Sequence, residues 1–311
     1  SRMLDARGLI WVGTDRDVNI TDSEALNRFM DSHAGTRDGA DSRIDWIVNC
    51  AAYTAVDRAE DDAETCRRLN SDGPANIAAC AKRHGARLIH VSTDYVFNGN
   101  GVRPYAETDP TDPTGVYGLT KRDGETSALA ANDATYIVRT AWLYGKYGNN
   151  FVYTMLRLMK QNGKATVVND QRGTPTWARD LAATIIAFID AALKGKAAPY
   201  GIYHYAGDGD ISWYDFACGI RDKATELSLL RSPCEVKPCT SAEFPAKVRR
   251  PPYSVLDKSK IAKALGIRIP DWRESLSEFL EEERPENMRK LTNILVTGGA
   301  GFIGCNFIHV L

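Results

Sequence analysis

The chain has 311 residues, of which 43% are hydrophobic and 25% are charged, and its formal net charge is −1. This length is typical of about two domains, and the apolar content is sufficient for a sizeable core. A near-zero charge without a long basic block excludes the electrostatic footprint of a protein that binds nucleic acid or an anionic membrane. We therefore expect a globular protein whose partner is a small molecule.

Cysteine usage and apolar runs exclude further classes. The seven cysteines form no C-x-x-C pair and no metal-ligand spacing with the five histidines, so we expect reduced thiols and neither disulfides nor zinc. The most apolar helix candidate, Leu181 to Leu193, contains Asp190 and is too short to span a bilayer, and the first residues lack the apolar core of a signal peptide. These features predict a cytoplasmic protein with no membrane partner.

Predicted strands and helices alternate in the first half of the chain. Residues 1–8 resemble the end of a helix that a glycine closes. The strands are predicted at Leu9–Thr14, Ile44–Cys50, Arg87–Ser92 and Tyr136–Thr140, and the helices at 22–33, 70–84 and 116–131. This order predicts an α/β fold with a doubly wound parallel sheet of the Rossmann type, which forms a dinucleotide-binding domain over residues 1–142.

The pattern becomes less regular after Trp142. Prolines separate helical stretches near 149–161, 177–193, 212–228 and 272–283. We expect residues 143–280 to form mainly a smaller C-terminal substrate lobe, and the charged stretch 281–292 to be a linker. Residues 293–311 contain an apolar run followed by T-G-G-A-G-F-I-G at 297–304, which predicts a strand and the glycine-rich turn of a dinucleotide-binding unit.

Tyr117 and Lys121 are the first candidates for chemistry. They lie four residues apart at the start of a predicted helix, so their side chains share one face. A tyrosine can protonate a carbonyl if its pKa falls from ~10 toward ~7, and a neighbouring ammonium favours that fall. The strand before them ends in Ser92 and Thr93, at the sheet edge where ligands bind. A solvated helix face and a strand-end cap remain the alternatives.

Six motifs in order carry a resemblance to a known family. They are N-C-A-A-Y-T-A-V-D at 49–57, H-V-S-T-D-Y-V-F at 90–97, V-Y-G-L-T-K at 116–121, R-T-A-W at 139–142, V-V-N-D-Q-R-G-T-P-T at 167–176 and R-P-P-Y-S at 250–254. Together they resemble the dTDP-4-dehydrorhamnose reductases, which are extended short-chain dehydrogenases/reductases. The resemblance covers nearly all of residues 1–280.

The resemblance implies reduction of the C4 ketone of dTDP-4-dehydro-6-deoxy-L-mannose to dTDP-L-rhamnose by NADPH or NADH. Tyr117 would donate the proton, Lys121 would hold the nicotinamide ribose and lower the tyrosine pKa, and Thr93 would hydrogen-bond the carbonyl. The implied substrate-binding residues are Thr54, Ala55, Val56, Asp57, Asp94, Trp142 and Arg250. Helix capping by the Thr54–Asp57 stretch, core packing of Trp142 and a surface ion pair of Arg250 remain open as alternatives.

The cofactor preference stays open on sequence grounds. Asp15 suits the ribose hydroxyls of NADH and Arg16 suits the 2′-phosphate of NADPH, with a slight preference for NADPH. The other implied cofactor-binding residues are Asn19, Ile20, Ala51, Ala52, Tyr53, Gly298, Gly301 and Gly304, although those outside the glycine turn also fit packing at the sheet edge. The family further allows a homodimer bridged by Mg²⁺, whose ligands the sequence does not place.

The chain departs from the family at both ends. The family's first strand and its G-x-x-G-x-x-G turn are not found before Ser1, whereas residues 293–311 resemble the opening of a dTDP-glucose 4,6-dehydratase. One hypothesis is a fragment of a reductase fused to a dehydratase. The other is that Asn293–Thr297 inserts between the strands Leu9–Thr14 and Ile44–Cys50 and places its glycines at the cofactor pyrophosphate.

Alternative functions also remain. Tyr95 stands where dehydratases carry an acidic residue, so the bulk of the chain is expected to reduce and not to dehydrate. A reductase of another 4-keto sugar nucleotide, such as a GDP-sugar, is the nearer alternative. A regulatory subunit that binds a dinucleotide without catalysis is the more distant one.

Overall fold

Four parallel strands form the central sheet of the computed structural model. They are β3 (Trp46–Asn49), β4 (Arg87–Thr93), β5 (Thr135–Thr140) and β10 (Gly201–His204), in the spatial order β10-β5-β4-β3. β4 and β5 are buried along nearly their whole length, as expected for strands that are covered on both faces. The structure describes residues 2–33, 36–37, 40–41, 43–230, 232, 234–244 and 246–284.

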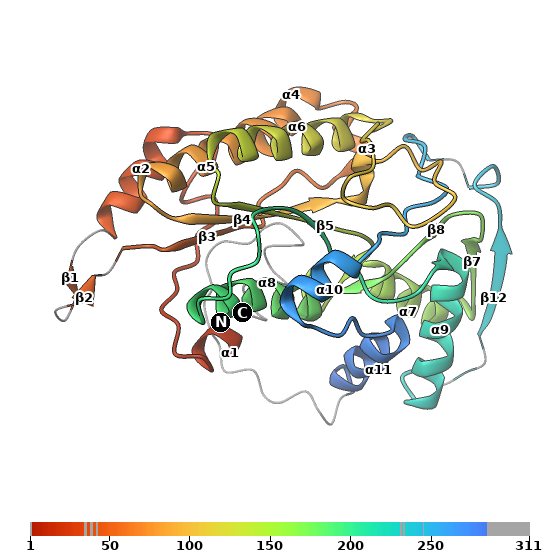
Figure 1. Ribbon diagram of the computed structural model, residues 1–311. Helices are drawn as coiled ribbons and strands as arrows, with labels where there is room; N and C mark the ends of the chain where they lie inside the picture. The colour runs from red at the N-terminus through yellow and green to blue at the C-terminus, as the bar shows by residue number, and fades with distance from the viewer. Residues whose placement is uncertain are drawn as a thin grey trace.

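Helices cover both faces of this sheet (Figure 1). The first face carries α2 (Ser23–Ser32), α5 (Gly73–Arg83) and α6 (Val116–Ala131). The second face carries α1 (Arg2–Asp5), α8 (Ala178–Leu193) and α10 (Ser259–Leu265). Alternate side chains of β4 and β5 enter the two cores. The predicted α/β, doubly wound arrangement is therefore confirmed.

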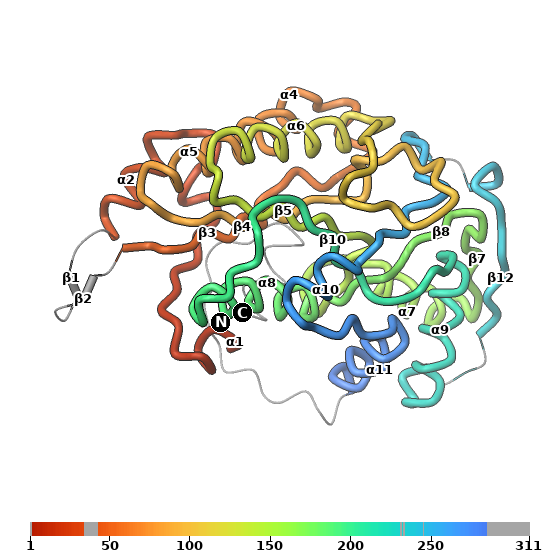
Figure 2. The backbone as a smooth tube through the Cα atoms, in the orientation of Figure 1, coloured from red at the N-terminus to blue at the C-terminus, as the bar shows by residue number. Residues whose placement is uncertain are grey.

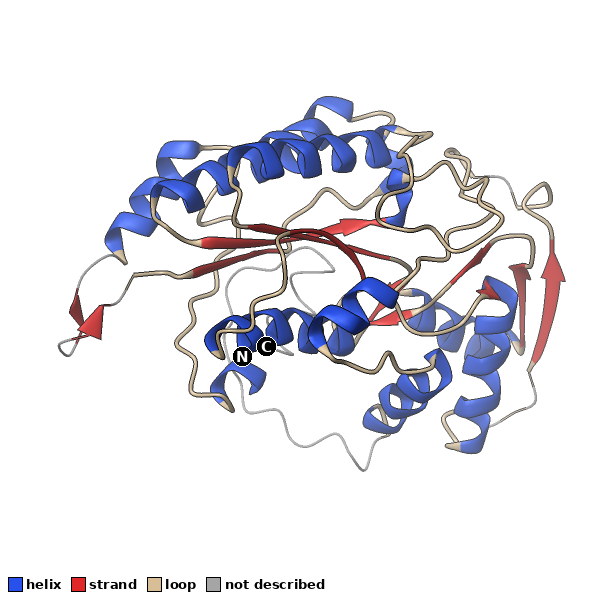
Figure 3. Cartoon of the chain, viewed as in Figure 1, coloured by secondary structure: helices blue, strands red, loops and turns tan. Residues whose placement is uncertain are grey.

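A smaller group of helices and short strands lies beside the carboxyl ends of the main strands (Figure 3). Its helices are α7 (Phe151–Asn162), α9 (Trp213–Glu226) and α11 (Trp272–Glu282). Its strands pair as β7 (Lys164–Val168) with β12 (Glu235–Cys239), β6 (Leu143–Tyr144) with β9 (Thr176–Trp177), and β8 (Arg172–Gly173) with β11 (Ile211–Ser212). Tyr144, Phe216, Trp272 and Phe279 are buried in the core of this group.

Short elements connect these parts. They are the two-stranded ribbon β1 (Thr36–Arg37) and β2 (Ala40–Asp41), the helices α3 (Val56–Ala59) and α4 (Ala63–Arg67), a π-helix η1 (Arg68–Asp72) and a 3₁₀ helix η2 (Asp94–Val96). Every helix predicted from residue 22 onward is present; α6 has its predicted ends, and the ends of the others are shifted by a few residues at most. β10 was not predicted, and it joins the main sheet although it follows Trp142.

The predicted strand Leu9–Thr14 is wrong. This segment has no regular secondary structure, and Ile10 is 95% exposed. Leu9 packs on the face of the sheet that carries α8, whereas Val18 packs on the face that carries α5. The segment between them therefore passes from one face to the other (Figure 2). A strand needs a hydrogen-bonded neighbour, and among the described strands none pairs with this segment.

Several predictions concern residues outside the described part of the chain. These are the strand Asn293–Thr297, the glycines Gly298, Gly301 and Gly304, and most of the predicted linker. Helix α11 continues through Glu282, so the first two residues of that linker range are helical. Because Leu9–Thr14 is not a strand, the predicted insertion has lost one of its two flanking partners.

Neither a membrane span nor a metal cluster is found in the described ranges. No helix there is both long enough and apolar enough to cross a bilayer. No three histidine, cysteine, aspartate or glutamate side chains among these residues are grouped to hold a metal ion. The six cysteines that the structure describes are free thiols.

Candidate active site

The three predicted catalytic residues lie together at the carboxyl end of β4. Thr93 is the last residue of the strand, and Tyr117 and Lys121 lie in the first turns of α6. All three are buried, with exposed fractions of 6%, 8% and 2% respectively. Their spacing along α6 directs Tyr117 and Lys121 to the side that packs on the sheet. The alternative of a solvated helix face is thereby excluded.

Tyr117 belongs to a short hydrogen-bond chain. Its hydroxyl hydrogen-bonds with Thr93, and the Thr93 hydroxyl donates to Asp94 Oδ1 at 3.0 Å. The Tyr95 amide donates to Thr93 Oγ1 at 3.2 Å, so Thr93 also caps the 3₁₀ helix η2. Burial raises the pKa of Asp94 to about 6.

The structure corrects one expectation about Tyr117. A lowered pKa was predicted for its hydroxyl, but burial outweighs the neighbouring hydrogen bond and raises the pKa instead. Tyr117 therefore keeps its proton at neutral pH. This is the protonation state that a general acid needs before reaction.

Lys121 is enclosed between α6 and the sheet. Its Nζ donates to the Val91 carbonyl oxygen at 2.8 Å and lies 3.3 Å from His90 Nε2. Burial lowers the pKa of Lys121 to about 8, while the negative charge of Glu125 acts in the opposite direction. A buried lysine with a pKa near neutrality is typical of a functional site.

Close packing fixes the position of α6. A Cβ atom on Gly118 would lie 2.2 Å from the Tyr95 carbonyl oxygen, and one on Gly124 would lie 2.0 Å from the Asn70 carbonyl oxygen. Any larger residue at either position would push the helix away from its neighbours. Glu60 Oε1 accepts from the first amide of α6 at 2.8 Å, where the helix dipole favours an anion. The helix that carries the predicted catalytic side chains Tyr117 and Lys121 is therefore held rigidly.

A buried ion pair lies one turn beyond Lys121. Arg139 on β5 donates to Glu125 through Nε at 2.9 Å and through Nη2 at 2.7 Å. Ser92 Oγ donates to the same carboxylate at 2.5 Å. Both charged side chains are only 3% exposed. These hydrogen bonds connect α6 to β4 and β5 next to the predicted catalytic residues.

Ala51, Ala52 and Tyr53 follow β3 at the same edge of the sheet. Asn70 Oδ1 accepts from the Tyr53 amide at 2.7 Å, and its Nδ2 donates to the Tyr53 carbonyl oxygen at 3.0 Å. Ala51 is exposed, and its amide donates to Asn49 Oδ1 at 3.0 Å. These three predicted cofactor residues thus lie on a backbone that two buried asparagines hold at the ligand-binding edge.

Four other predicted cofactor residues lie on the segment before α2, namely Asp15, Arg16, Asn19 and Ile20. The Asp15 amide donates to Asp17 Oδ1 at 2.6 Å, and Arg16 is exposed. Asn19 Oδ1 accepts from both the amide and the hydroxyl of Thr21. Ile20 packs so closely on α5 that a Cβ atom on Gly73 would lie 2.6 Å from it. Ile20 therefore packs against α5, and its contact with the cofactor stays a prediction.

The predicted substrate loop leads into α3. Thr54 and Ala55 are exposed, and no side chain caps the start of that helix, so the capping alternative is wrong. Asp57 accepts from the Val248 amide at 3.1 Å and from Arg250 Nη2 at 2.5 Å. Arg250 is thus in an ion pair, but its Nη1 is buried and has no hydrogen-bond partner among the described residues.

Trp142 occupies a strained backbone position after β5. Its φ of 47° is a left-handed value that side chains other than glycine rarely adopt. Its indole stacks on Trp213 with the ring centroids 3.6 Å apart, and a Cβ atom on Gly173 would lie 2.4 Å from it. Strain of this kind persists only where packing imposes it, and it is frequent at ligand sites. Trp142 is partly buried, next to the residues that follow Thr93.

Comparison with known proteins decides the family. A family model described as the RmlD substrate binding domain matches residues 1–284. The dTDP-4-dehydrorhamnose reductase of Aggregatibacter actinomycetemcomitans is 43% identical over 263 residues, which cover 85% of this chain and 86% of that protein. The chain belongs to the dTDP-4-dehydrorhamnose reductase family.

Solved structures of this reductase family share the fold. A dTDP-4-dehydrorhamnose reductase from Clostridium acetobutylicum has a TM-score of 0.79 at 38% identity, and the match covers 90% of this chain and 92% of that one. The enzyme from Bacillus anthracis, solved in complex with NADP, has a TM-score of 0.76 at 35% identity, with 86% and 88% covered. The resemblance predicted from the six motifs is confirmed.

The sequence analysis missed several residues around the three predicted catalytic residues. These are Asn49, His90, Asn70, Glu125, Arg139 and Trp213. Asn49, His90 and Arg139 each open one of the six motifs, but the motif alone did not indicate what these residues do. The others act through contacts between residues far apart in the chain, which no local pattern shows.

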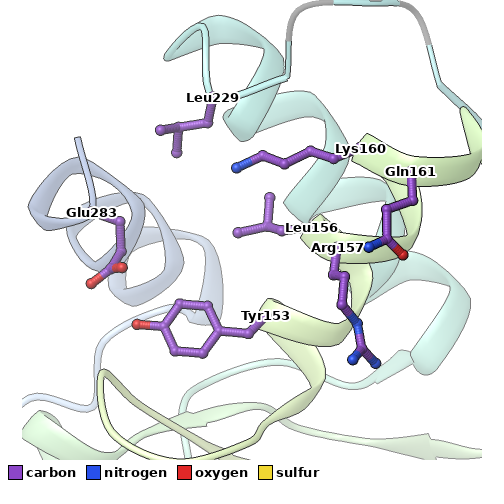
Figure 4. A pocket seen from close by; sticks show the side chains of 7 residues that line it. All are labelled: Tyr153, Leu156, Arg157, Lys160, Gln161, Leu229 and Glu283. Atoms are coloured by element: carbon purple, nitrogen blue, oxygen red, sulfur yellow. The ribbon is translucent and has the colours of Figure 1, made fainter. Parts of the chain in front are cut away.

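A cavity of about 330 Å³ lies elsewhere, between α7, Leu229 and the end of α11 (Figure 4). Tyr153, Leu156 and Lys160 line it, together with Glu283. None of the predicted site residues contributes to this cavity. It is therefore separate from the site at the carboxyl end of β4.

Proposed function

We propose that this chain reduces the C4 ketone of dTDP-4-dehydro-6-deoxy-L-mannose to dTDP-L-rhamnose. One observation carries the proposal: Thr93, Tyr117 and Lys121 are buried together at the carboxyl end of β4 in a chain of the dTDP-4-dehydrorhamnose reductase family. This is the edge at which doubly wound sheets bind ligands.

The residues at this edge fit the nicotinamide end of a dinucleotide. Lys121 supplies a buried amine, and Thr140 Oγ1 is buried without a hydrogen-bond partner among the described residues. Thr140 is the register partner of Thr93 on the neighbouring strand, so both lie at the same edge. The exposed loop from Ala51 offers further backbone groups. When bound, a nicotinamide cofactor supplies the hydride.

The proton comes from Tyr117 in this proposal. Its raised pKa keeps the hydroxyl protonated until the C4 oxygen gains negative charge, and the hydroxyl then transfers its proton to that oxygen. Thr93 holds Tyr117 in place and can turn its own hydroxyl from Asp94 to the same oxygen. Lys121 binds the nicotinamide ribose and, when protonated, stabilises the tyrosinate that forms.

The substrate residues are proposed at the opening of this site. Thr54, Ala55, Val56 and Asp57 form the loop that leads into α3, and Arg250 is fixed on Asp57 with Nη1 still available. A guanidinium suits the oxygens of a diphosphate. Asp94 and Trp142 complete the proposed sugar contacts.

We infer NADPH as the preferred cofactor. Arg16 is exposed beside Asp15, and a guanidinium there suits a 2′-phosphate. The Bacillus anthracis relative was solved with NADP. Arg16→Ala should raise the KM for NADPH several-fold and leave the KM for NADH unchanged. If the KM values for NADPH and NADH rose equally, Arg16 would have no part in the preference between the two cofactors.

The direct test is the loss of NADPH absorbance when the chain meets dTDP-4-dehydro-6-deoxy-L-mannose. Tyr117→Phe should lower kcat by about 10²- to 10⁴-fold because the proton donor is lost. Tyr153→Phe, which removes the same hydroxyl in the remote cavity, is the matched control and should retain activity. Product analysis should show dTDP-L-rhamnose.

Two outcomes would point to other functions. Inhibition by GDP in place of dTDP would indicate a reductase of another sugar nucleotide. Tight binding of the dinucleotide with no turnover of any 4-keto sugar would indicate a regulatory subunit.

A further inference from the structure

Asn49, His90 and Lys121 form a buried line across β3, β4 and α6. Asn49 is 4% exposed and His90 is fully buried. Asn49 Nδ2 lies 2.9 Å from His90 Nδ1, and His90 Nε2 lies 3.3 Å from Lys121 Nζ. The proposed reaction uses Lys121 but gives no role to the other two residues.

The Ala51 amide fixes the orientation of the Asn49 side chain. This amide donates to Asn49 Oδ1, so the Nδ2 end of the side chain faces His90. An amide nitrogen donates and does not accept, and His90 Nδ1 must therefore be the acceptor. Burial holds the pKa of His90 well below its usual range, so the ring is neutral. A neutral ring with a bare Nδ1 carries its proton on Nε2.

The Nε2–H group of His90 faces the amino group of Lys121. An ammonium has three donors and no acceptor, whereas a neutral amine has a lone pair. Lys121 Nζ already donates to the Val91 carbonyl oxygen. Only the neutral amine can satisfy both that carbonyl and the His90 N–H group. The hydrogen bonds around Lys121 therefore disfavour its charged form.

We propose that Asn49 and His90 are positioning residues that favour the neutral form of Lys121. Asn49 selects the Nε2–H tautomer of His90, and this N–H group faces the lysine. The negative charge of Glu125 on α6 acts in the opposite direction and favours the ammonium. Cys50 after β3 and Cys66 on α4 also lie near Lys121, but burial raises the pKa of both thiols, so they stay uncharged. Lys121 thus sits close to its point of proton exchange, where it can take up and release a proton during a reaction cycle. This proton exchange during a reaction cycle rests on the proposed function, whereas the tautomer of His90 and its effect on Lys121 do not.

His204 provides an internal comparison because it is equally buried. Its Nδ1 lies 3.0 Å from the Tyr105 carbonyl oxygen, and its Nε2 lies 3.4 Å from Arg139 Nη1. A carbonyl only accepts and a guanidinium only donates, so His204 carries its proton on Nδ1. The two buried histidines are therefore expected to be opposite tautomers.

Long-range ¹H–¹⁵N correlation spectra of the histidine side chains test the proposal on the whole chain. We expect His90 as the Nε2–H tautomer and His204 as the Nδ1–H tautomer, neither titrating near neutral pH, with His90→Gln and His204→Gln for assignment. If neither variant folds, the wild-type spectrum still decides. Absence of any non-titrating Nε2–H histidine would overturn the proposal, whether or not the chain reduces a sugar nucleotide.

Asn49→Asp reverses the proposed arrangement at nearly constant size. The carboxylate still accepts from the Ala51 amide, but its second oxygen requires an Nδ1–H group on His90, and the bare Nε2 then accepts from a Lys121 ammonium. We expect the His90 signal to switch tautomer and the alkaline limb of the pH profile of kcat to rise by about one unit, with KM unchanged.

Asn132→Asp is the matched control. Asn132 is also buried, and its Oδ1 accepts from the Ala134 amide at 3.0 Å in the same way, but it lies at the far end of α6. This variant should leave both the tautomer and the pH profile unchanged. An unchanged His90 tautomer in a folded Asn49→Asp variant, or the same pH shift in both variants, would overturn the proposal.

Discussion

Two cationic side chains, Lys121 of α6 and Arg139 of β5, are buried between this helix and the sheet, and they are held in different ways. Arg139 forms a forked ion pair with Glu125 and lies 5.1 Å from the centre of the Phe97 ring. Lys121, one turn away, contacts one carbonyl oxygen and one imidazole nitrogen, and it has no ion-pair partner among the described residues. The ion pair of Arg139 with Glu125 fixes the helix on the sheet. Lys121 has no such partner among the described residues, so it can gain or lose its proton more easily.

The largest change in stability is expected from breaking the buried ion pair between Arg139 and Glu125. Arg139→Met should lower the free energy of unfolding by about 3–5 kcal/mol because Glu125 loses its partner while still buried. Urea denaturation measures this loss. The double variant Glu125→Leu with Arg139→Met is the control and should recover most of the stability. A single variant as stable as the wild type would contradict the view that this pair fixes α6.

Lys121→Met should have the opposite effect on stability. The pKa of Lys121 is about 8 in the folded chain, against an ordinary value of 10.5, so below pH 8 both states bind the proton and the full cost of burying the ammonium is present. Removing the charge should raise the free energy of unfolding at pH 7 by about 3 kcal/mol and abolish reduction.

The pH dependence sharpens this test. Between pH 8 and 10.5 only the unfolded state still binds the proton, so wild-type stability should rise with pH and the advantage of Lys121→Met should disappear. Denaturant midpoints at several pH values measure this. Lys82, which is exposed in an ion pair with Asp133, supplies the control Lys82→Met, with a change within about 0.5 kcal/mol. A constant advantage across the range would contradict the lowered pKa.

Trp142 shows a third way of holding a residue, by packing alone. Trp213→Leu removes the stacked ring and should cost about 1 kcal/mol of stability. If Trp142 contacts the sugar, the same variant should raise the substrate KM without changing the pH profile. Calorimetric or urea unfolding and steady-state kinetics provide the two measurements. If the stability and the substrate KM both stayed unchanged, the left-handed backbone conformation of Trp142 would not depend on its stacking with Trp213.

The smallest effect is expected in the segment wrongly predicted as a strand. Ile10→Thr should change the free energy of unfolding by less than about 0.5 kcal/mol, because Ile10 is 95% exposed in the described structure. Val138→Thr on β5 is the comparison, since that residue is fully buried in a strand. A loss of several kcal/mol at Ile10 would mean that this segment is covered by chain outside the described residues.

The sequence by itself determined the order and type of most elements and the candidate catalytic residues. Periodicity is a local property, so the helix 116–131 and the strands ending at Ser92 and Thr140 were predicted close to their observed bounds. Tyr117 and Lys121 were found because their spacing puts them on one side of a helix. The motifs were enough to predict the family that the comparisons then confirmed.

Only the tertiary structure decided which groups are paired and which are buried. Leu9–Thr14 has the composition of a strand, but a strand exists only beside a partner. The direction of the Tyr117 pKa was mispredicted because burial, which depends on the whole fold, outweighs the nearby hydrogen bond. His90 lies 41 residues from Asn49 and 31 from Lys121. Hydrogen bonds over such separations depend on how strands and helices pack, and that geometry is not written in any local pattern.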